Sequence, residues 1–364
     1  MEKRLLFFAS DFEIGLTQAN TEVVSALWQS EKVDMLCLTS EKEQEPGLHR
    51  KLDEAGVKKC VIEGLDVHDH FRDKVRALRA VVSGHGITHA NVQNNWQLAL
   101  AVYVKYRYVH RLKIIYTIHG YRHNSPLKAV LAIGMIGMAL LLFTDRVISM
   151  SSYVSRRFWF LGYKTDVVFY LMNKPQYAKT TNRIIGSPLR LVFPAQFRKG
   201  KNQQILISAI KQYVDQTHDL SIRLYLPGAG PRLDAMKVLA RQLGVEQQVV
   251  FPGKLNLDGV FALYEESNIA LCASNVETYG RCIAEPFMLG RCVVTHKTGV
   301  AIDIIRDREN GVFFCTDKDL AALLTDFHAH PEKVVAMANQ AFVDRQVFST
   351  ENVLRSYLSV INKV

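Results

Sequence analysis

The 364-residue sequence predicts an α/β protein built from two doubly wound parallel sheets. Short apolar runs with strand character alternate with amphipathic, helix-like segments along almost the whole chain. The alternation pauses once, at the polar stretch 173–189, which contains two prolines and has no clear period. A chain of this length also suits two domains better than one.

Strand-like runs in the first part of the chain are separated by helix-like segments, as parallel pairing requires. These runs are RLLFFAS, VDMLCLT, KKCVIE, THANVQ, KIIYTIH, RVISMS and DVVFYLM. A second series extends from LRLVFPA to GVFFC. We therefore predict an N-terminal Rossmann-like domain at 1–175 and a C-terminal one at 176–345. A terminal helix within 346–364 begins with a Ser/Thr capping signal, and we expect it to pack back on the N-terminal domain.

The composition is that of an ordinary soluble protein, with 48% hydrophobic and 22% charged residues. The first residues lack the apolar core and cleavage site of a signal peptide, which favours a cytoplasmic location. The six cysteines have neither C-x-x-C pairing nor zinc-ligand spacing. We therefore expect reduced thiols rather than disulfides.

Positive charge is concentrated in residues 101–180, which contain twelve Lys and Arg residues and only two acidic residues, Asp145 and Asp166. This excess equals the net charge of +10 of the whole chain. The same stretch holds fifteen consecutive apolar or Gly residues, 129–143, too few for a typical membrane span. Two interpretations stay open: a solvated basic face with a buried helix, or peripheral attachment to an anionic membrane. No nucleic-acid-binding module accompanies the charge, so nucleic acid is not an expected partner.

Two glutamates, Glu277 and Glu285, lie eight positions apart in residues 274–294, SNVETYGRCIAEPFMLGRCVV. A helix predicted to begin near Tyr279–Arg281 would offer free backbone N–H groups to a diphosphate. Glu277 precedes this helix, and Glu285 is expected two turns into it, where it could accept hydrogen bonds from a ribose. The spacing suits a nucleotide-sugar. Two solvated acids are the alternative explanation.

The surrounding residues resemble the signature of retaining glycosyltransferases of family 4, which have the GT-B fold. The matching positions are Glu277, Gly280, Glu285, Gly290, Asn310 and Gly311, with Tyr279 in place of the usual Phe. The resemblance implies that Glu277 contacts the transferred sugar and that Glu285 binds the ribose. It also implies a donor-binding helix start at Tyr279, Gly280 and Arg281.

Other positions take implied roles from the same resemblance. Lys201 matches the family lysine that binds the donor diphosphate. Arg198 is the candidate for the family arginine, although an exposed loop arginine is the alternative. The remaining candidates are backbone groups near Lys254 and Leu255 for the base, Gly15 for the donor phosphates, His119 as active-site histidine, and Tyr121, Arg122 and Asn124 on the acceptor side.

The family implies metal-independent, front-face substitution, in which the leaving diphosphate oxygen helps to take the acceptor's proton. Glu277, His119 and Lys201 are the expected catalytic residues, and positive groups at Lys201 and Arg198 would stabilise the leaving diphosphate. The only D-x-D-like motif, DKD at 317–319, opens a helix-like segment, and its aspartates are better explained as N-cap residues. We therefore expect neither a metal nor a cofactor.

Taken together, the sequence predicts a hexosyltransferase that uses a UDP- or GDP-sugar and a glycan acceptor in bacterial surface-polysaccharide synthesis. The acceptor is expected to be lipid-linked, with the enzyme cytoplasmic and peripheral on the inner face of the membrane. Two alternatives remain: a sugar-nucleotide epimerase of GT-B-like fold, and a non-catalytic membrane- or anion-binding protein. The sequence names neither the sugar, the base, the acceptor nor the linkage.

Overall fold

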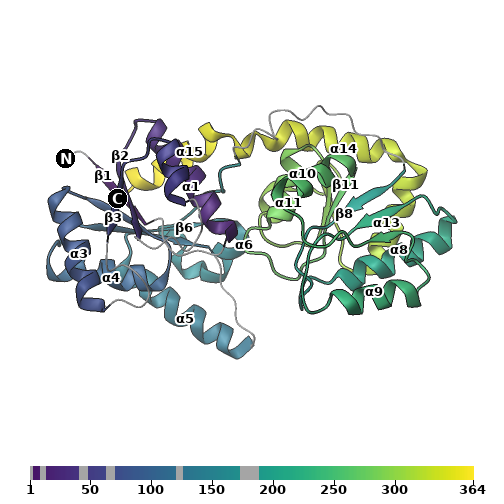
Figure 1. Cartoon of the computed structure of the whole chain (residues 1–364), viewed down its shortest axis with the longest axis horizontal. Helices are drawn as coiled ribbons and strands as arrows, with labels where there is room; N and C mark the ends of the chain where they lie inside the picture. The colour runs from purple at the N-terminus through teal and green to yellow at the C-terminus, as the bar shows by residue number, and fades with distance from the viewer. Residues whose placement is uncertain (1–2, 9–13, 41–47, 63–69, 120–125, 173–187) are drawn as a thin grey trace. The chain divides into compact units, whose positions relative to one another are not determined.

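The computed structural model describes residues 3–8, 14–40, 48–62, 70–119, 126–172 and 188–364 (Figure 1). The chain divides into two compact units, residues 1–173 with 348–364 and residues 174–347. Each unit contains a parallel sheet flanked by helices, so the predicted fold class of two doubly wound sheets is confirmed. Most of the predicted linker 173–189 lies outside the described residues.

The sheet of the first unit has seven parallel strands in the order β3-β2-β1-β4-β5-β6-β7. They are β1 (Arg4–Phe8), β2 (Asp34–Ser40), β3 (Lys59–Ile62), β4 (His89–Val92), β5 (Lys113–Ile118), β6 (Arg146–Ser149) and β7 (Thr165–Val167). The order reverses between β1 and β4. In open α/β sheets such a switch point leaves a crevice at the carboxyl ends of the strands, where ligands bind.

Helices cover both faces of this sheet (Figure 1). α1 (Ile14–Gln29) contacts α2 (Leu48–Glu54) and α15 (Thr350–Asn362) on one face. The other face carries α3 (Phe71–Gly84), α4 (Asn95–Arg107) and α5 (Pro126–Phe143). The short helices α6 (Ser152–Ser155) and η1 (Arg156–Lys164) connect β6 to β7.

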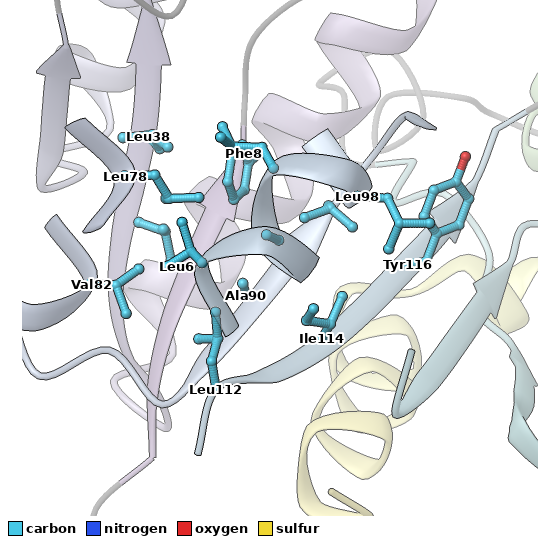
Figure 2. Packing of buried hydrophobic residues seen from close by; sticks show 14 of the residues in the cluster. Leu6, Phe8, Leu38, Leu78, Val82, Ala90, Leu98, Leu112, Ile114 and Tyr116 are labelled. Atoms are coloured by element: carbon cyan, nitrogen blue, oxygen red, sulfur yellow. The ribbon is translucent and has the colours of Figure 1, made fainter. Parts of the chain in front are cut away.

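A hydrophobic cluster lies between the sheet and the α3–α4 layer (Figure 2). Residues of the inner strands point toward helical residues, as alternation along a strand predicts. The cluster includes Leu6 and Phe8 of β1, Leu78 and Val82 of α3, Ala90 of β4, Leu98 of α4, and Ile114 and Tyr116 of β5. Burial of the Tyr116 ring raises the pKa of its phenol to about 12, so it stays neutral.

The last helix belongs to the first unit, although the second unit precedes it in sequence. Ser349 caps α15 by accepting a hydrogen bond from the Asn352 N–H at 3.3 Å. The Lys363 ammonium forms an ion pair with Asp166, and the Lys3 ammonium donates to the Ile361 carbonyl at 2.9 Å. These contacts hold both chain ends against one sheet.

The sheet of the second unit has six parallel strands in the order β10-β9-β8-β11-β12-β13. They are β8 (Arg190–Val192), β9 (Arg223–Tyr225), β10 (Val249–Val250), β11 (Ile269–Cys272), β12 (Cys292–Thr295) and β13 (Gly311–Phe313). The helices are α8 (Gln203–Thr217), α9 (Leu233–Gln242), α10 (Leu257–Glu266), α11 (Arg281–Met288), α12 (Ala301–Ile304), α13 (Asp317–Ala329) and α14 (Pro331–Asp344), and η2 (Arg345–Phe348) follows them. The switch point of this sheet lies between β8 and β11.

The DKD motif lies at the start of α13, as predicted, but its aspartates are not the N-cap residues that the sequence predicted. Thr316 is the N-cap residue, and its hydroxyl accepts a hydrogen bond from the Asp319 N–H at 3.1 Å. The Asp319 carboxylate in turn accepts from the Thr316 N–H at 2.9 Å, which completes a capping box. These bonds hold the pKa of Asp319 below its usual value. The aspartate thus has a structural role here.

No helix in the described part of the chain combines the length and apolar character required to cross a membrane.

Gly228 allows the loops after β8 and β9 to hydrogen-bond side by side. The Ala195 N–H donates to the Pro227 carbonyl at 3.1 Å, and the Phe197 N–H donates to the Ala229 carbonyl at 3.0 Å. Gly228 has a φ of +152°, and a Cβ there would overlap the Ala195 carbonyl oxygen. Only glycine therefore permits this close approach.

We predict that Gly228→Ala destabilises the second unit much more than Gly253→Ala does. Gly253 also has a positive φ, +79°, but a Cβ there meets nothing within 4 Å, so the change should cost only about 1–2 kcal/mol of backbone strain. Gly228→Ala adds a backbone clash, and its cost should clearly exceed that. Urea unfolding measures both, and equal losses would contradict the packing described here.

Candidate active site

An ion pair between Lys201 and Glu277 lies at the switch point of the second sheet. Lys201 follows β8, and Glu277 follows β11, the strand paired with β8. The ammonium of Lys201 donates to the carboxylate of Glu277, and the two side chains are only 12% and 13% exposed. This largely buried charge pair lies at the carboxyl ends of central strands, where ligands bind in this class of fold.

Backbone contacts fix the two loops that carry this pair. The Asn275 N–H donates to the Gly200 carbonyl at 2.9 Å, and the amide of Asn202 donates to the Ala273 carbonyl at 2.9 Å. Asn202 has a left-handed backbone, with a φ of +55°, a conformation that asparagine tolerates better than most residues. The loop after β8 is thereby attached to the end of β11.

The turn after β12 supports the glutamate from the other side. The Glu277 N–H donates to the buried Thr298 hydroxyl at 2.8 Å, and the Val300 N–H donates to the Tyr279 carbonyl at 2.7 Å. Gly299 has a φ of +55°, and a Cβ there would overlap the Tyr279 carbonyl oxygen. Thr298 and Gly299 are residues that sequence reasoning did not single out. The Gly-containing loop after the strand was the available signal.

Glu285 is closer to the start of its helix than predicted. α11 begins at Arg281 with Gly280 as N-cap, so Glu285 lies just over one turn into the helix rather than two. Its carboxylate is buried and pairs with the Arg281 guanidinium at 2.6 Å, across one helical turn. The Tyr264 hydroxyl lies 3.5 Å from the other carboxylate oxygen. Sequence reasoning missed this pairing, although the i, i+4 spacing of Arg281 and Glu285 predicts it.

The remaining predicted donor-side residues of the second unit lie on loops at the same edge of this sheet. Gly280 has a φ of +91°, and its carbonyl accepts the first helical hydrogen bonds of α11. Tyr279 is buried, and Arg198 is half-buried in the turn that leads to Lys201. Lys254 is exposed and Leu255 is half-buried, both between β10 and α10. The Gly228 N–H links this loop to its neighbour by donating to the Gly253 carbonyl at 2.8 Å.

Two cysteines lie directly behind the glutamate. The Cys282 thiol donates to the Cys272 sulfur at 3.7 Å, and this lowers the pKa of Cys272 while raising that of Cys282. The two sulfurs and a Glu277 carboxylate oxygen lie within 4.8 Å of one another. Within the described ranges, this is the one group whose donor atoms could hold a metal ion. The cysteine spacing in the sequence did not indicate it.

A buried polar network surrounds His119 in the first unit. His119 follows β5, Gln93 follows β4, and Tyr170 lies beyond β7. One ring nitrogen of His119, Nε2, contacts the Gln93 amide oxygen, and the other, Nδ1, contacts the Tyr170 hydroxyl at 2.7 Å. The Gln93 amide nitrogen donates to Asn91. Sequence reasoning identified only the histidine, because its partners come from strands that are distant in sequence.

Burial lowers the pKa of His119 to about 3, so its ring is neutral near pH 7. The Gln93 amide oxygen can only accept, so Nε2 carries the proton and donates it there. Nδ1 then accepts from the Tyr170 hydroxyl. The neighbours of His119 therefore set both its charge and its tautomer.

Four sequence-predicted residues remain. Gly15 lies in the first turn of α1, after the loop that leaves β1. The acceptor-side candidates Tyr121, Arg122 and Asn124 lie outside the described residues.

The sequence of the second unit is similar to a known protein family. Residues 178–343 match the family model of glycosyl transferases group 1. An uncharacterized glycosyltransferase of Methanocaldococcus jannaschii is 28% identical over 123 residues, 34% of this chain and 31% of that protein. The Dictyostelium discoideum GDP-Man:Man(3)GlcNAc(2)-PP-Dol alpha-1,2-mannosyltransferase is 24% identical over 46% of this chain and 35% of its own length. The matched stretches thus span about a third of each curated relative.

Solved structures resemble the chain over its whole length. The crystal structure of Anabaena HepE in complex with UDP has a TM-score of 0.76 at 17% identity and covers 100% of both chains. The same protein has been solved with UDP-glucose. The chain therefore has the GT-B fold, and residues 178–343 are similar in sequence to glycosyl transferases group 1.

Proposed function

We propose that this chain is a retaining, metal-independent glycosyltransferase that moves a hexose from a nucleotide-sugar to a glycan acceptor. The observation that carries the proposal is the Lys201–Glu277 pair at the switch point of the second sheet. It places a cation and a carboxylate where a donor diphosphate and its sugar would bind. A screen of UDP- and GDP-sugars for thermal stabilisation and sugar transfer tests it, because ligand at 100 times its Kd should stabilise the fold by about 2.7 kcal/mol.

In this proposal each partner of the pair has a separate task. The Lys201 ammonium stabilises negative charge that builds on the diphosphate as the bond to the sugar breaks. Glu277 holds the ammonium in place before the donor arrives and then accepts hydrogen bonds from sugar hydroxyls. Arg198 and the start of α11 near Gly280 and Arg281 contribute further positive potential. The diphosphate oxygen that leaves the sugar takes the acceptor's proton.

Glu285 reaches the donor together with Arg281 in this arrangement. One carboxylate oxygen is bound by the Arg281 guanidinium, and the other, which also lies 3.5 Å from the Tyr264 hydroxyl, would accept from the ribose hydroxyls. A carboxylate is an ionised acceptor, which binds hydroxyls more strongly than a neutral acceptor does. Backbone groups near Lys254 and Leu255 would hold the base.

His119 is proposed as a neutral group rather than as a general base, and a sugar hydroxyl would bind its ring in exchange for the contact with Gln93 or Tyr170. A group whose pKa is about 3 takes up no proton near pH 7. Gln93 and Tyr170 orient its ring. The crevice expected beside β4 in this sheet is consistent with a sugar or acceptor site at this position.

The donor and acceptor classes are part of the proposal. HepE, which shares the fold, has been solved with UDP and UDP-glucose, and this supports a nucleotide-sugar donor. The Dictyostelium relative is named for a PP-Dol acceptor, and this supports a lipid-linked acceptor here. We place the enzyme in the cytoplasm, on the inner face of the membrane, in surface-polysaccharide synthesis. An epimerase or a non-catalytic binder would transfer no sugar from any donor.

We predict different kinetic effects for the two glutamates. Glu277→Gln should lower the rate of transfer by about 100-fold or more, because a contact made to the reacting sugar is lost, while donor affinity survives in part. Glu285→Gln should mainly weaken donor binding, by about tenfold or more, because a charged hydrogen-bond acceptor is lost. Transfer assays and calorimetric donor Kd values measure both.

Asp215→Asn is the matched control for these variants. Asp215 forms an exposed ion pair with Lys211 on α8, away from the strand ends, so its loss should leave both quantities unchanged. Near-normal kinetics in both glutamate variants would refute the assignment.

We predict that transfer proceeds undiminished in excess EDTA. The Lys201 ammonium already neutralises the Glu277 carboxylate, so the Cys272–Glu277–Cys282 group has a cation of its own. Activity lost to EDTA and restored by Mg²⁺ or Mn²⁺ would contradict the mechanism. A different pair of results would instead assign a thiolate-bound metal. In the parent, only Zn²⁺ would restore the activity lost to EDTA, and in Cys272→Ser, EDTA would have no effect on activity.

We predict that acid destabilises the protein partly through His119. The pKa of His119 is lowered to about 3 by burial, so between pH 3 and 6.5 the unfolded state binds a proton that the folded state does not. Stability therefore falls as the pH decreases through this window, by about 2 kcal/mol from pH 6.5 to 5. His119→Gln should remove this part of the slope in urea unfolding, whereas the exposed His330→Gln should not. Equal slopes in all three proteins would contradict the neutral histidine.

A further inference from the structure

The inner side of α5 is packed as a core helix would be. Leu140 is fully buried, and Ile133 and Ile136 pack against the hydrophobic cluster of the first unit. Gly137 lies against the Phe160 ring of η1, where a Cβ would overlap the aromatic atoms. Packing against the core therefore accounts for one apolar stripe of the helix, the inner one.

The outer side of α5 is apolar as well. Met135, Met138 and Leu142 recur at helical spacing and are 75%, 52% and 60% exposed. The helix sequence contains a single charged residue, Lys128. A helix that is apolar all round is ordinarily buried on all sides, so the outer stripe calls for an apolar partner.

Ring contacts link exposed aromatic side chains to the surroundings of α5. The Tyr106 ring, at the end of α4, makes an edge-on contact with Phe143, with ring centroids 6.2 Å apart. Trp159 is 78% exposed and contacts Phe160, the ring that packs on Gly137. Tyrosine and tryptophan concentrate where an apolar phase meets water, because each ring has an apolar body and a polar tip.

A basic rim adjoins the aromatic side chains. Arg107 follows Tyr106, and the guanidinium groups of Arg107 and Arg79 lie over the Tyr108 ring, 5.8 and 4.4 Å from its centre. Arg111 is exposed in the loop that follows. The sequences of α3 and α4 contain a single acid, Asp73, so the potential on this side of the unit is positive.

We propose that this surface, formed by the outer side of α5 with Tyr106, Trp159 and the rim arginines, docks on an anionic lipid bilayer. We call it the α5 surface. The apolar stripe would insert between the acyl chains near the headgroups, the aromatic rings would lie at the interface, and the arginines would bind lipid phosphates. The inference deepens the proposed membrane location and rests on it only for the acceptor's lipid anchor.

The rim charge favours a bilayer over a protein partner. Protein interfaces are depleted in charged residues at their core, and the polar rim around that core does not require charges of a single sign. Anionic lipids combine apolar tails with negative headgroups in the order that the α5 surface matches: an apolar stripe, then aromatic rings, then guanidinium groups. A second protein or a second copy of this chain is therefore an outcome for the test to exclude.

Vesicle flotation with the full-length protein tests the apolar part. The parent should bind phosphatidylcholine vesicles that contain 30% phosphatidylglycerol. Met135→Gln with Leu142→Gln should lower the partition coefficient at least tenfold, since two inserted side chains become polar. The matched control is Leu220→Gln with Val343→Gln, two equally exposed apolar residues of the second unit, and it should bind as the parent does.

Substitution of the rim tests the charged part. Arg107→Gln with Arg111→Gln should weaken binding about thirtyfold at 0.1 M salt, the effect of two basic residues near an anionic surface. The difference from the parent should shrink at 0.5 M salt, because screening removes the same attraction. Arg50→Gln with Arg355→Gln changes equally exposed arginines of α2 and α15, on the other face of the sheet, and should have little effect.

Trp159 reports insertion directly. Its emission should shift to the blue on addition of anionic vesicles, and brominated lipids should quench it. Trp159→Phe should abolish both signals, because Trp28 and Trp96 are half-buried elsewhere in the unit.

Parent-like vesicle binding by both double variants would overturn the proposal. So would failure of the parent to bind vesicles, or lipid-free self-association that Met135→Gln with Leu142→Gln abolishes. Sugar transfer to a soluble acceptor, measured on the same variants, should be unchanged. Vesicle binding without sugar transfer would contradict the proposed function while leaving the α5 surface in place.

Discussion

The ion pair between Lys201 and Glu277 ties together the two loops that leave the central strands of the second sheet. Strand order reverses between β8 and β11, so the helices that follow these strands leave on opposite faces and open a crevice at the carboxyl edge. Opposite charges keep the loops together where no strand does. Removal of either partner would leave the other charge half-buried and unpaired, which costs more than the pair itself contributes.

Hydrogen bonds from the main chain make this arrangement rigid. The loops after β8, β9 and β10 are linked by amide–carbonyl bonds, and the turn after β12 holds Glu277 through Thr298. Gly228 and Gly299 are required because the backbones approach too closely for a Cβ. A site whose charged groups are held before the ligand arrives needs little reorganisation when charge develops on the ligand.

The first unit holds its candidate residue in the opposite way, by burial. His119 is enclosed by Gln93 and Tyr170, and its low pKa follows from removal of the ring from water. The same unit leaves the outer side of α5 in solvent although it is apolar. Core packing accounts for Leu140 and Gly137, but not for Met135, Met138 and Leu142. This contrast within one helix motivates the membrane inference.

The sequence by itself determined the fold class. Alternation of strand-like and helix-like runs implies parallel sheets, because parallel strands need a crossover, and both sheets have the predicted strands. The resemblance to family 4 glycosyltransferases also selected Lys201, Glu277 and Glu285 before any contact was known. Their roles as donor ligands stay a prediction. The capping signal of α15 was equally local, whereas at α13 the sequence placed the start of the helix but not its N-cap residue, which is Thr316 rather than an aspartate.

Only the tertiary structure decided which side chains meet. Lys201 and Glu277 are 76 residues apart, and strand pairing between β8 and β11 brings them together. Periodicity cannot show that Cys272 and Cys282 lie behind Glu277, that Gln93 and Tyr170 fix the tautomer of His119, or that one side of α5 stays exposed. A one-dimensional pattern reports which residues can share a face of an element, whereas the order of strands in the sheet determines which faces and loops come together.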